Sequence, residues 1–79
     1  MRVFVKLFAT LSRYSPGGLS GTRFEIDLLE GSSLQEMVDQ LGIPGEETRI
    51  AFVNGVIQPM DWILKSDDEV GIFPPIGGG

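Results

Sequence analysis

The chain has 79 residues and a formal net charge of −5, and it contains no cysteine and no histidine. Disulfides, thiol nucleophiles, zinc sites of the Cys/His type and histidine-based triads are therefore excluded. The acidic balance argues against nucleic acid, whose partners carry a basic stripe, and the short apolar runs predict neither a membrane span nor a secretory leader. We expect a cytoplasmic protein with one folded domain over residues 1–75.

The first third of the chain predicts two strands joined by a long loop. Residues 2–8 (RVFVKLF) are dense in β-branched and aromatic side chains. The loop ATLSRYSPGGLSG follows and begins with a helical turn. Residues 22–28 (TRFEIDL) alternate apolar and charged side chains, as a half-buried strand does, and should pair with the first strand. The side chains expected to face the core are Val3, Val5, Leu7, Phe24, Ile26 and Leu28.

A single helix is predicted within GSSLQEMVDQLGIP, and both of its ends are readable. Ser33 and Glu36 have the spacing of a capping box. Apolar residues at positions 34, 37, 38 and 41 form one stripe of helical period. Gly42 suits the left-handed cap, and Pro44 prevents the helix from continuing.

The rest of the chain predicts a hairpin, a connector and a last strand. Asn54-Gly55 between apolar residues is the strongest short signal for a hairpin. The connector PMDWILKSDDEV offers Met60, Trp62 and Leu64 as apolar anchors, and we expect Trp62 in the core rather than at an interface. EVGIF forms the last strand. One helix covers one sheet face, so the fold class is α+β: a mixed sheet of four to five strands wrapped around one main helix, the β-grasp architecture of ubiquitin.

The same alternation predicts an apolar patch on the other face of the sheet. If Val3, Val5 and Leu7 face the helix, then Phe4 and Phe8 point outward, and so does Phe73 on the last strand. Large exposed patches on small proteins usually mark a partner interface. The alternative is that the long loop or the connector covers these rings.

The chain ends in FPPIGGG, a stiff exit followed by bare glycines. Pro74 and Pro75 lack amide donors, so the strand stops pairing and the flexible tail of residues 76–79 is directed away from the sheet, with a reach of about 13 Å. Ile76, Gly77 and Gly78 form the part of the tail that a partner would bind. Because glycine has no Cβ, the last residues would fit a narrow channel. The α-carboxylate of Gly79 stands at the tip. ATP would convert it to an acyl adenylate, and a sulfur nucleophile would then give a thiocarboxylate. This chemistry needs no catalytic side chain and no metal on the chain itself.

The whole chain resembles the MoaD/ThiS family of ubiquitin-like sulfur carriers. The stretches that carry the resemblance are VKLFATL, EGSSLQEMVDQLGI, VNG, DDEVGIFPP and the terminal Gly-Gly. The resemblance implies a thiocarboxylate on Gly79, made by an E1-like adenylating enzyme that uses ATP and a persulfide or sulfide donor. It implies no bound cofactor and no independent enzymatic activity. In the molybdopterin branch such a protein is the small subunit of molybdopterin synthase, and its tail enters the large subunit. In the thiamin branch it delivers sulfur with thiazole synthase.

Particular residues bear on the choice between these branches. Phe73-Pro74-Pro75 and the opening LFATL favour the molybdopterin branch, whereas PMDWILK resembles the thiamin branch. Gly77 stands at a position where a small residue such as alanine or serine is common in the family. SDDEV stands where DGDEV is usual, which predicts Ser66 or Asp67 in a less relaxed backbone conformation. Two other functions stay open: a protein modifier conjugated to lysines through Gly79, and a plain interaction module with incidental glycines.

Overall fold

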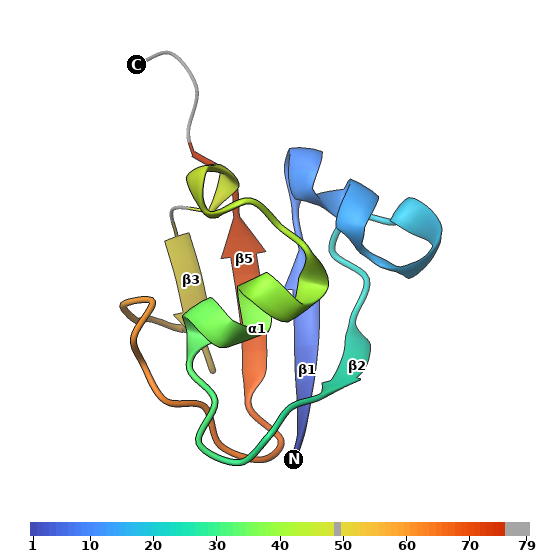
Figure 1. Ribbon diagram of the computed structural model, residues 1–79. Coiled ribbons are helices and arrows are strands. Elements are labelled where there is room, and N and C mark those ends of the chain that lie inside the picture. The colour runs from blue at the N-terminus through green and yellow to red at the C-terminus, as the bar shows by residue number, and fades with distance from the viewer. Residues whose placement is uncertain (49, 76–79) are drawn as a thin grey trace.

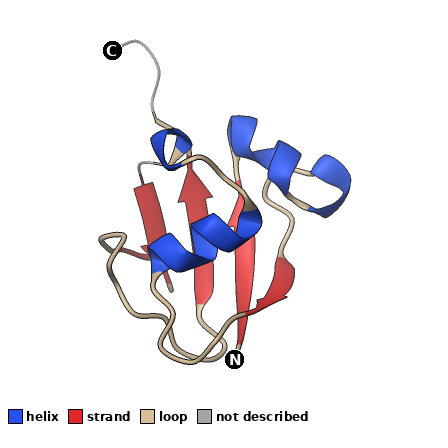
Figure 2. Ribbon diagram, viewed as in Figure 1, coloured by secondary structure: helices blue, strands red, loops and turns tan. Residues whose placement is uncertain are grey.

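The computed structural model describes residues 1–48 and 50–75, which form a five-stranded mixed sheet with one α-helix across one face (Figures 1 and 2). The order of the strands in the sheet is β2-β1-β5-β3-β4. The strands and the helix are β1 Arg2–Leu7, β2 Phe24–Asp27, α1 Leu34–Leu41, β3 Ile50–Val53, β4 Val56–Ile57 and β5 Glu69–Phe73. Three short 3-10 helices complete the fold: η1 Ala9–Tyr14, η2 Pro16–Gly18 and η3 Gly45–Glu47. This confirms the expected β-grasp architecture. None of the helices within the described ranges is long and apolar enough to cross a membrane.

Strand β5 lies at the centre of the sheet, between β1 and β3. It pairs in parallel with β1 and antiparallel with β3. Strand β1 also pairs antiparallel with β2, as predicted, and β3 continues into β4 through Asn54-Gly55. Both turn residues have positive φ angles, 51° and 84°, which the tight hairpin requires.

The core lies between α1 and the facing side of the sheet. Alternate residues of the two central strands are buried, and the buried stripe of α1 packs against them. These residues are Val3, Val5, Leu7, Val70, Ile72, Leu34, Met37 and Val38. Leu28 is buried as expected, whereas Phe24 and Ile26 are half-buried because β2 is an edge strand. The expectation for Trp62 is wrong, because its side chain is 38% exposed and Leu64 is the buried anchor of the connector.

The predicted ends of α1 are confirmed at atomic detail. The Glu36 backbone N–H donates to Ser33 Oγ at 3.1 Å, and the Ser33 N–H donates to Glu36 Oε1 at 3.0 Å. Gly42 ends the helix in the left-handed region, with φ 79°. Such a capping box stabilises a helix by about 1 kcal/mol because it satisfies amide groups that the first turn leaves open.

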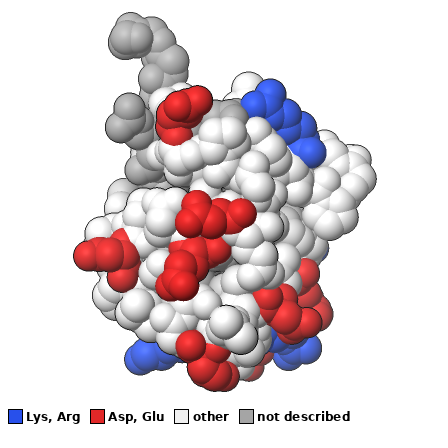
Figure 3. Space-filling model, viewed as in Figure 1, with Lys and Arg blue, Asp and Glu red and all other residues white. Residues whose placement is uncertain are grey.

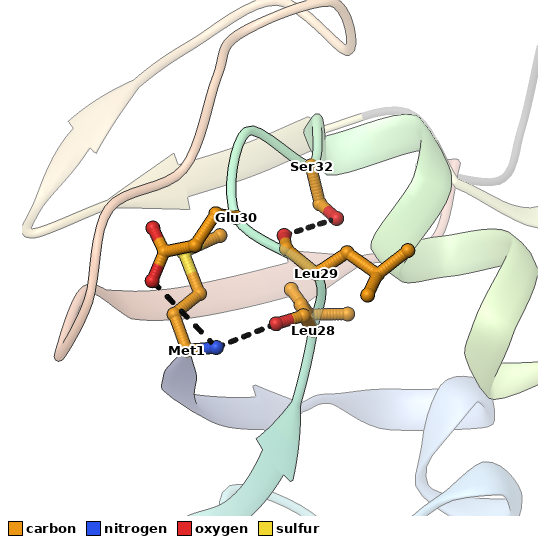
Figure 4. A network of polar contacts seen from close by, with 5 residues as sticks. All are labelled: Met1, Leu28, Leu29, Glu30 and Ser32. Atoms are coloured by element: carbon orange, nitrogen blue, oxygen red, sulfur yellow. Dashed lines mark hydrogen bonds and ion pairs between the residues drawn. The ribbon is translucent and has the colours of Figure 1, made fainter.

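Backbone contacts fix the segment between β2 and α1 to the start of β1 (Figure 4). The Met1 amino group donates to the Leu28 carbonyl oxygen at 2.6 Å and lies 3.9 Å from Glu30 Oε1. The Leu28 N–H donates back to the Met1 carbonyl oxygen at 2.8 Å. Ser32 Oγ donates to the Leu29 carbonyl oxygen at 2.7 Å, which closes the turn that precedes α1. These contacts fix the segment that leads into α1, and the helix lies across one face of the sheet (Figure 1).

The turn before β5 has the strained residue that the sequence predicted. Asp67 adopts φ 69°, a conformation that glycine takes more readily. Its backbone N–H donates to the Arg2 carbonyl oxygen at 2.7 Å, and its carboxylate lies 3.2 Å from the Arg2 guanidinium. Neighbouring Asp68 accepts a hydrogen bond from Asn54 Nδ2 at 2.9 Å, which joins this turn to the hairpin.

Candidate functional site

The sheet face opposite α1 carries an aromatic cluster formed by Phe4, Phe8, Phe52 and Phe73. These are four of the five phenylalanines in the chain, and all four are half-buried. Strand alternation places them there, because their neighbours in β1, β3 and β5 point into the core. The outward orientation predicted for three of these rings is confirmed, and their role as a partner interface stays a prediction.

The rings of the aromatic cluster are ordered by contacts with one another and with arginine. Phe8 and Phe73 stack in parallel with their centroids 4.3 Å apart, and Phe52 meets Phe73 edge-on at 5.5 Å. At the other end of the cluster, the guanidinium of Arg23 lies 4.3 Å from the centroid of Phe4. Aromatic pairs of this geometry contribute about 0.5–1.5 kcal/mol beyond their buried area, so the cluster is partly rigid before any partner binds.

A hollow of about 550 Å³ opens between these rings, and Gly71 forms its floor. In the register of the sheet, Gly71 stands between Lys6 on β1 and Phe52 on β3. A Cβ built on Gly71 would lie 3.4 Å from the Phe8 ring and 3.9 Å from the Phe73 ring. The missing side chain in the central strand therefore lets these two rings pack close to the backbone of β5.

The long loop covers only one edge of the aromatic cluster. Gly21 lies beside the Phe8 ring, since a Cβ built on it would be 3.4 Å from that ring, and its N–H donates to the Leu7 carbonyl oxygen at 2.8 Å. Phe4, Phe52 and Phe73 still line the open hollow. The alternative in which the loop or the connector covers the whole patch is therefore wrong.

A second, apolar groove of about 460 Å³ lies where the chain leaves the sheet. Phe52 and Phe73 border both this exit groove and the hollow, so the two depressions are neighbours. The residues that line the exit groove are Ala9, Ile50, Phe52, Phe73, Pro74 and Pro75. Ala9 holds φ 53°, an uncommon value for a residue with a side chain, and its methyl group borders the groove. The remaining predicted site residues, Ile76, Gly77, Gly78 and Gly79, lie outside the described residues.

The structure adds residues to the site that the sequence analysis did not single out. Phe52, Gly71, Lys6 and Arg23 all line the hollow. The alternation of IAFV, with buried Ala51 and Val53, is a signal that would have placed Phe52 outward. Gly71 gives no such signal, because its importance comes from neighbours on two other strands.

Charge is distributed unevenly over the surface. Acidic side chains spread over the face that carries α1, and basic ones lie toward its edges (Figure 3). The opposite face holds Arg2, Lys6 and Arg23, half of the six basic residues in the chain, together with the acidic residues Glu25 and Glu69. No group of three or more acidic side chains suited to a metal ion occurs within residues 1–48 and 50–75. The site therefore presents aromatic rings, the Lys6 ammonium and the Arg23–Glu69 ion pair next to the exit groove.

The chain matches one protein-family model and is similar to several solved structures. The model of the ThiS family matches residues 5–79. A putative molybdopterin converting factor, subunit 1, from Pyrococcus furiosus is 28% identical, with a TM-score of 0.73 over 95% of this chain and 98% of that one. The H. volcanii small archaeal modifier protein 1 is 20% identical, with a TM-score of 0.72 over the same shares.

A third similar structure is a complex of subunits 1 and 2 of the molybdopterin-converting factor from Helicobacter pylori. It is 20% identical, with a TM-score of 0.61, and the match covers 100% of both chains. Among curated proteins, no sequence matches this chain. At 20% identity the last two structures bear on the fold alone.

Proposed function

The chain belongs to the ThiS family, and from this membership we propose that it is a sulfur carrier whose C-terminal Gly79 becomes a thiocarboxylate. The observation that carries the proposal is the family match over residues 5–79, which includes the Gly-Gly ending. Pro74 directly after β5 supports it, because proline cannot extend the ladder and the chain must leave the sheet there.

The proposed reaction has two steps. A carboxylate oxygen of Gly79 attacks the α-phosphorus of ATP on an E1-like adenylating enzyme, and pyrophosphate leaves. Hydrosulfide then attacks the acyl carbon of the adenylate, and AMP leaves with the C–O bond electrons, which yields the thiocarboxylate. If a protein persulfide delivers the sulfur instead, the first product is an acyl disulfide, and a thiol reduces it. The chain supplies the acyl group and its positioning, and the partner supplies the catalytic groups.

We place the carrier in the molybdopterin branch, as the small subunit of a synthase in the cytoplasm. The sequence Phe73-Pro74-Pro75 favours this branch, and the P. furiosus structure that is 28% identical carries the name of a molybdopterin converting factor subunit. The partner that we propose for this branch is the large synthase subunit, and the H. pylori structure, which is similar in fold, is a complex of subunits 1 and 2 of the converting factor. The aromatic cluster beside the exit groove would bind that subunit while residues 74–79 enter it.

Two further functions follow from the same activated carboxylate. A carrier of the thiamin branch would pass its sulfur to thiazole synthase. A protein modifier would form an isopeptide bond when a lysine amine attacks the adenylate in place of sulfur, and a structure named as a modifier shares the fold. The plain interaction module is the least favoured, because it gives the glycine ending no role.

Intact mass tests the proposal directly. The chain is incubated with ATP, hydrosulfide and the adenylating enzyme encoded in the same genome, and the C-terminal peptide is then sequenced by fragmentation. The expected product has one sulfur in place of one oxygen on Gly79, and a variant that lacks Gly78 and Gly79 should give none. An unchanged mass with an adenylating enzyme that is active on its own carrier would contradict the proposal. Branched peptides on lysine would indicate the modifier.

A further inference from the structure

Lys6 lines the hollow, and its side chain is exposed. Among the residues that the structure describes, no carboxylate lies within ion-pair distance of its ammonium group. The two arginines on the same face are already paired, Arg2 with Asp67 at 3.2 Å and Arg23 with Glu69 at 3.5 Å. An exposed ammonium group that has no ion pair within residues 1–48 and 50–75 can pair with an acidic group of a partner.

The surroundings of Lys6 favour an apolar group at the same place. Phe4 and Phe8 flank it along β1, and Gly71 faces it across the pairing with β5. Gly71 lines the hollow without a side chain of its own, and the Phe8 and Phe73 rings lie 3.4 and 3.9 Å from where its Cβ would be. An incoming apolar side chain would therefore pack against these rings, with Phe52 as a further wall. Burial of apolar surface there contributes about 25 cal/mol per Å², so a large apolar side chain gains most from the hollow.

We propose that the hollow binds a protein segment in which a large apolar side chain stands next to a carboxylate. The apolar side chain lies in the hollow against the rings of the aromatic cluster, and the carboxylate pairs with the Lys6 ammonium. This inference rests on the proposed function, because Phe52 and Phe73 border both the hollow and the exit groove. A partner that binds the tail would therefore also contact the hollow. We expect this partner to supply the segment.

Two probes of the same shape and opposite charge test this chemistry, 4-phenylbutyrate and 4-phenylbutylammonium. In NMR titrations of the full chain, we expect the anion to shift the amide resonances of Lys6, Gly71 and Phe73, and the cation to shift them much less. The net charge of −5 favours the cation elsewhere on the surface, so this preference is specific to the hollow. Equal shifts from both probes, or none from the anion, would overturn the proposal.

Matched variants separate the charge from the shape. Lys6→Gln should raise the Kd for 4-phenylbutyrate about two- to fivefold, with a smaller effect at high salt, because a solvent-exposed ion pair is weak and screened. Lys65→Gln is the control, since Lys65 is also exposed and its side chain has no ion pair within the described ranges. Gly71→Val should abolish the shifts by filling the floor, with spectral dispersion as the check on folding. Equal Kd values for both lysine variants would contradict the role of Lys6.

The alternative occupant of the hollow is a second copy of this chain. Shifts at Lys6 and Gly71 that grow with protein concentration, without any probe, would indicate self-association and overturn the proposal. The thiocarboxylation assay stays a separate readout. Sulfur transfer to Gly79 with no preference for the anion refutes only the inference about the hollow, whereas the absence of sulfur transfer refutes the proposed function.

Discussion

Asn54 is the exposed residue whose substitution should cost the most stability. It occupies a left-handed position, φ 51°, at the β3–β4 turn. Its Nδ2 donates to Asp68 Oδ1 at 2.9 Å, and its Oδ1 accepts from the Glu69 N–H at 2.9 Å. The side chain therefore joins the hairpin to the turn before the central strand. We predict that Asn54→Ala destabilises the fold by about 2–3 kcal/mol.

The magnitude follows from two contributions. Loss of two hydrogen bonds that are open to solvent costs about 0.5–1 kcal/mol each, and one of the acceptors is charged. An alanine forced to a positive φ costs roughly 1 kcal/mol more than asparagine, which tolerates this region. For a domain of this size, each kcal/mol lowers Tm by about 4–8 °C, so we expect a decrease of about 10–20 °C.

Urea unfolding followed by far-UV circular dichroism measures the change, with Asn54→Gly as the control. Glycine also loses the hydrogen bonds but relieves the backbone, so it should retain about 0.5–1 kcal/mol more stability than alanine. In a double-mutant cycle with Asp68→Ala, the effects should be non-additive because the two side chains contact each other. A loss below about 0.5 kcal/mol for Asn54→Ala, or a larger loss for Asn54→Gly, would refute this reasoning.

Three more predictions address the helix cap, the exit groove and the tail. Ser33→Ala should lose about 1 kcal/mol in the same urea assay because it removes the acceptor for the Glu36 N–H, and an unchanged midpoint would show that the cap contributes nothing. Ala9→Gly should raise stability by about 0.5 kcal/mol, since glycine takes φ 53° more readily; a destabilised variant would mean that the methyl contacts outweigh the strain. Gly79→Ala should keep the wild-type Tm and lose most of the mass gain by sulfur, and normal sulfur transfer would contradict the narrow channel.

The elements that could be predicted from sequence are those whose determinants lie close together in the chain. The capping box needs only Ser33 and Glu36, and the hairpin needs only Asn54-Gly55. The inward and outward faces of β1 and β5 follow from strict alternation, which is why Phe4, Phe8 and Phe73 were placed on the right face. These signals are local, so tertiary packing had little opportunity to overrule them.

The features that could not be predicted depend on which strands become neighbours. Gly71 matters because Lys6 and Phe52, far away in the chain, are its partners in register. Trp62 was misplaced for a related reason. A tryptophan in a connector signals burial only if something covers it, and here Leu64 takes the buried position while Trp62 stays 38% exposed. Residues such as Gly71 can therefore be assigned to the site only when the register of the sheet is known.

Phe73 links the stability of the folded domain to the position at which the chain leaves the sheet. Its backbone pairs with Ile50 at the end of the β3–β5 ladder, and its ring is held between Phe8 and Phe52. The point from which Pro74 departs is thus set by both the sheet and the aromatic cluster. Substitutions at Phe73 must change stability and binding together, because the same ring serves both. Residues 76–79 follow two prolines that cannot extend the ladder, so we expect substitutions there to change reactivity without changing stability.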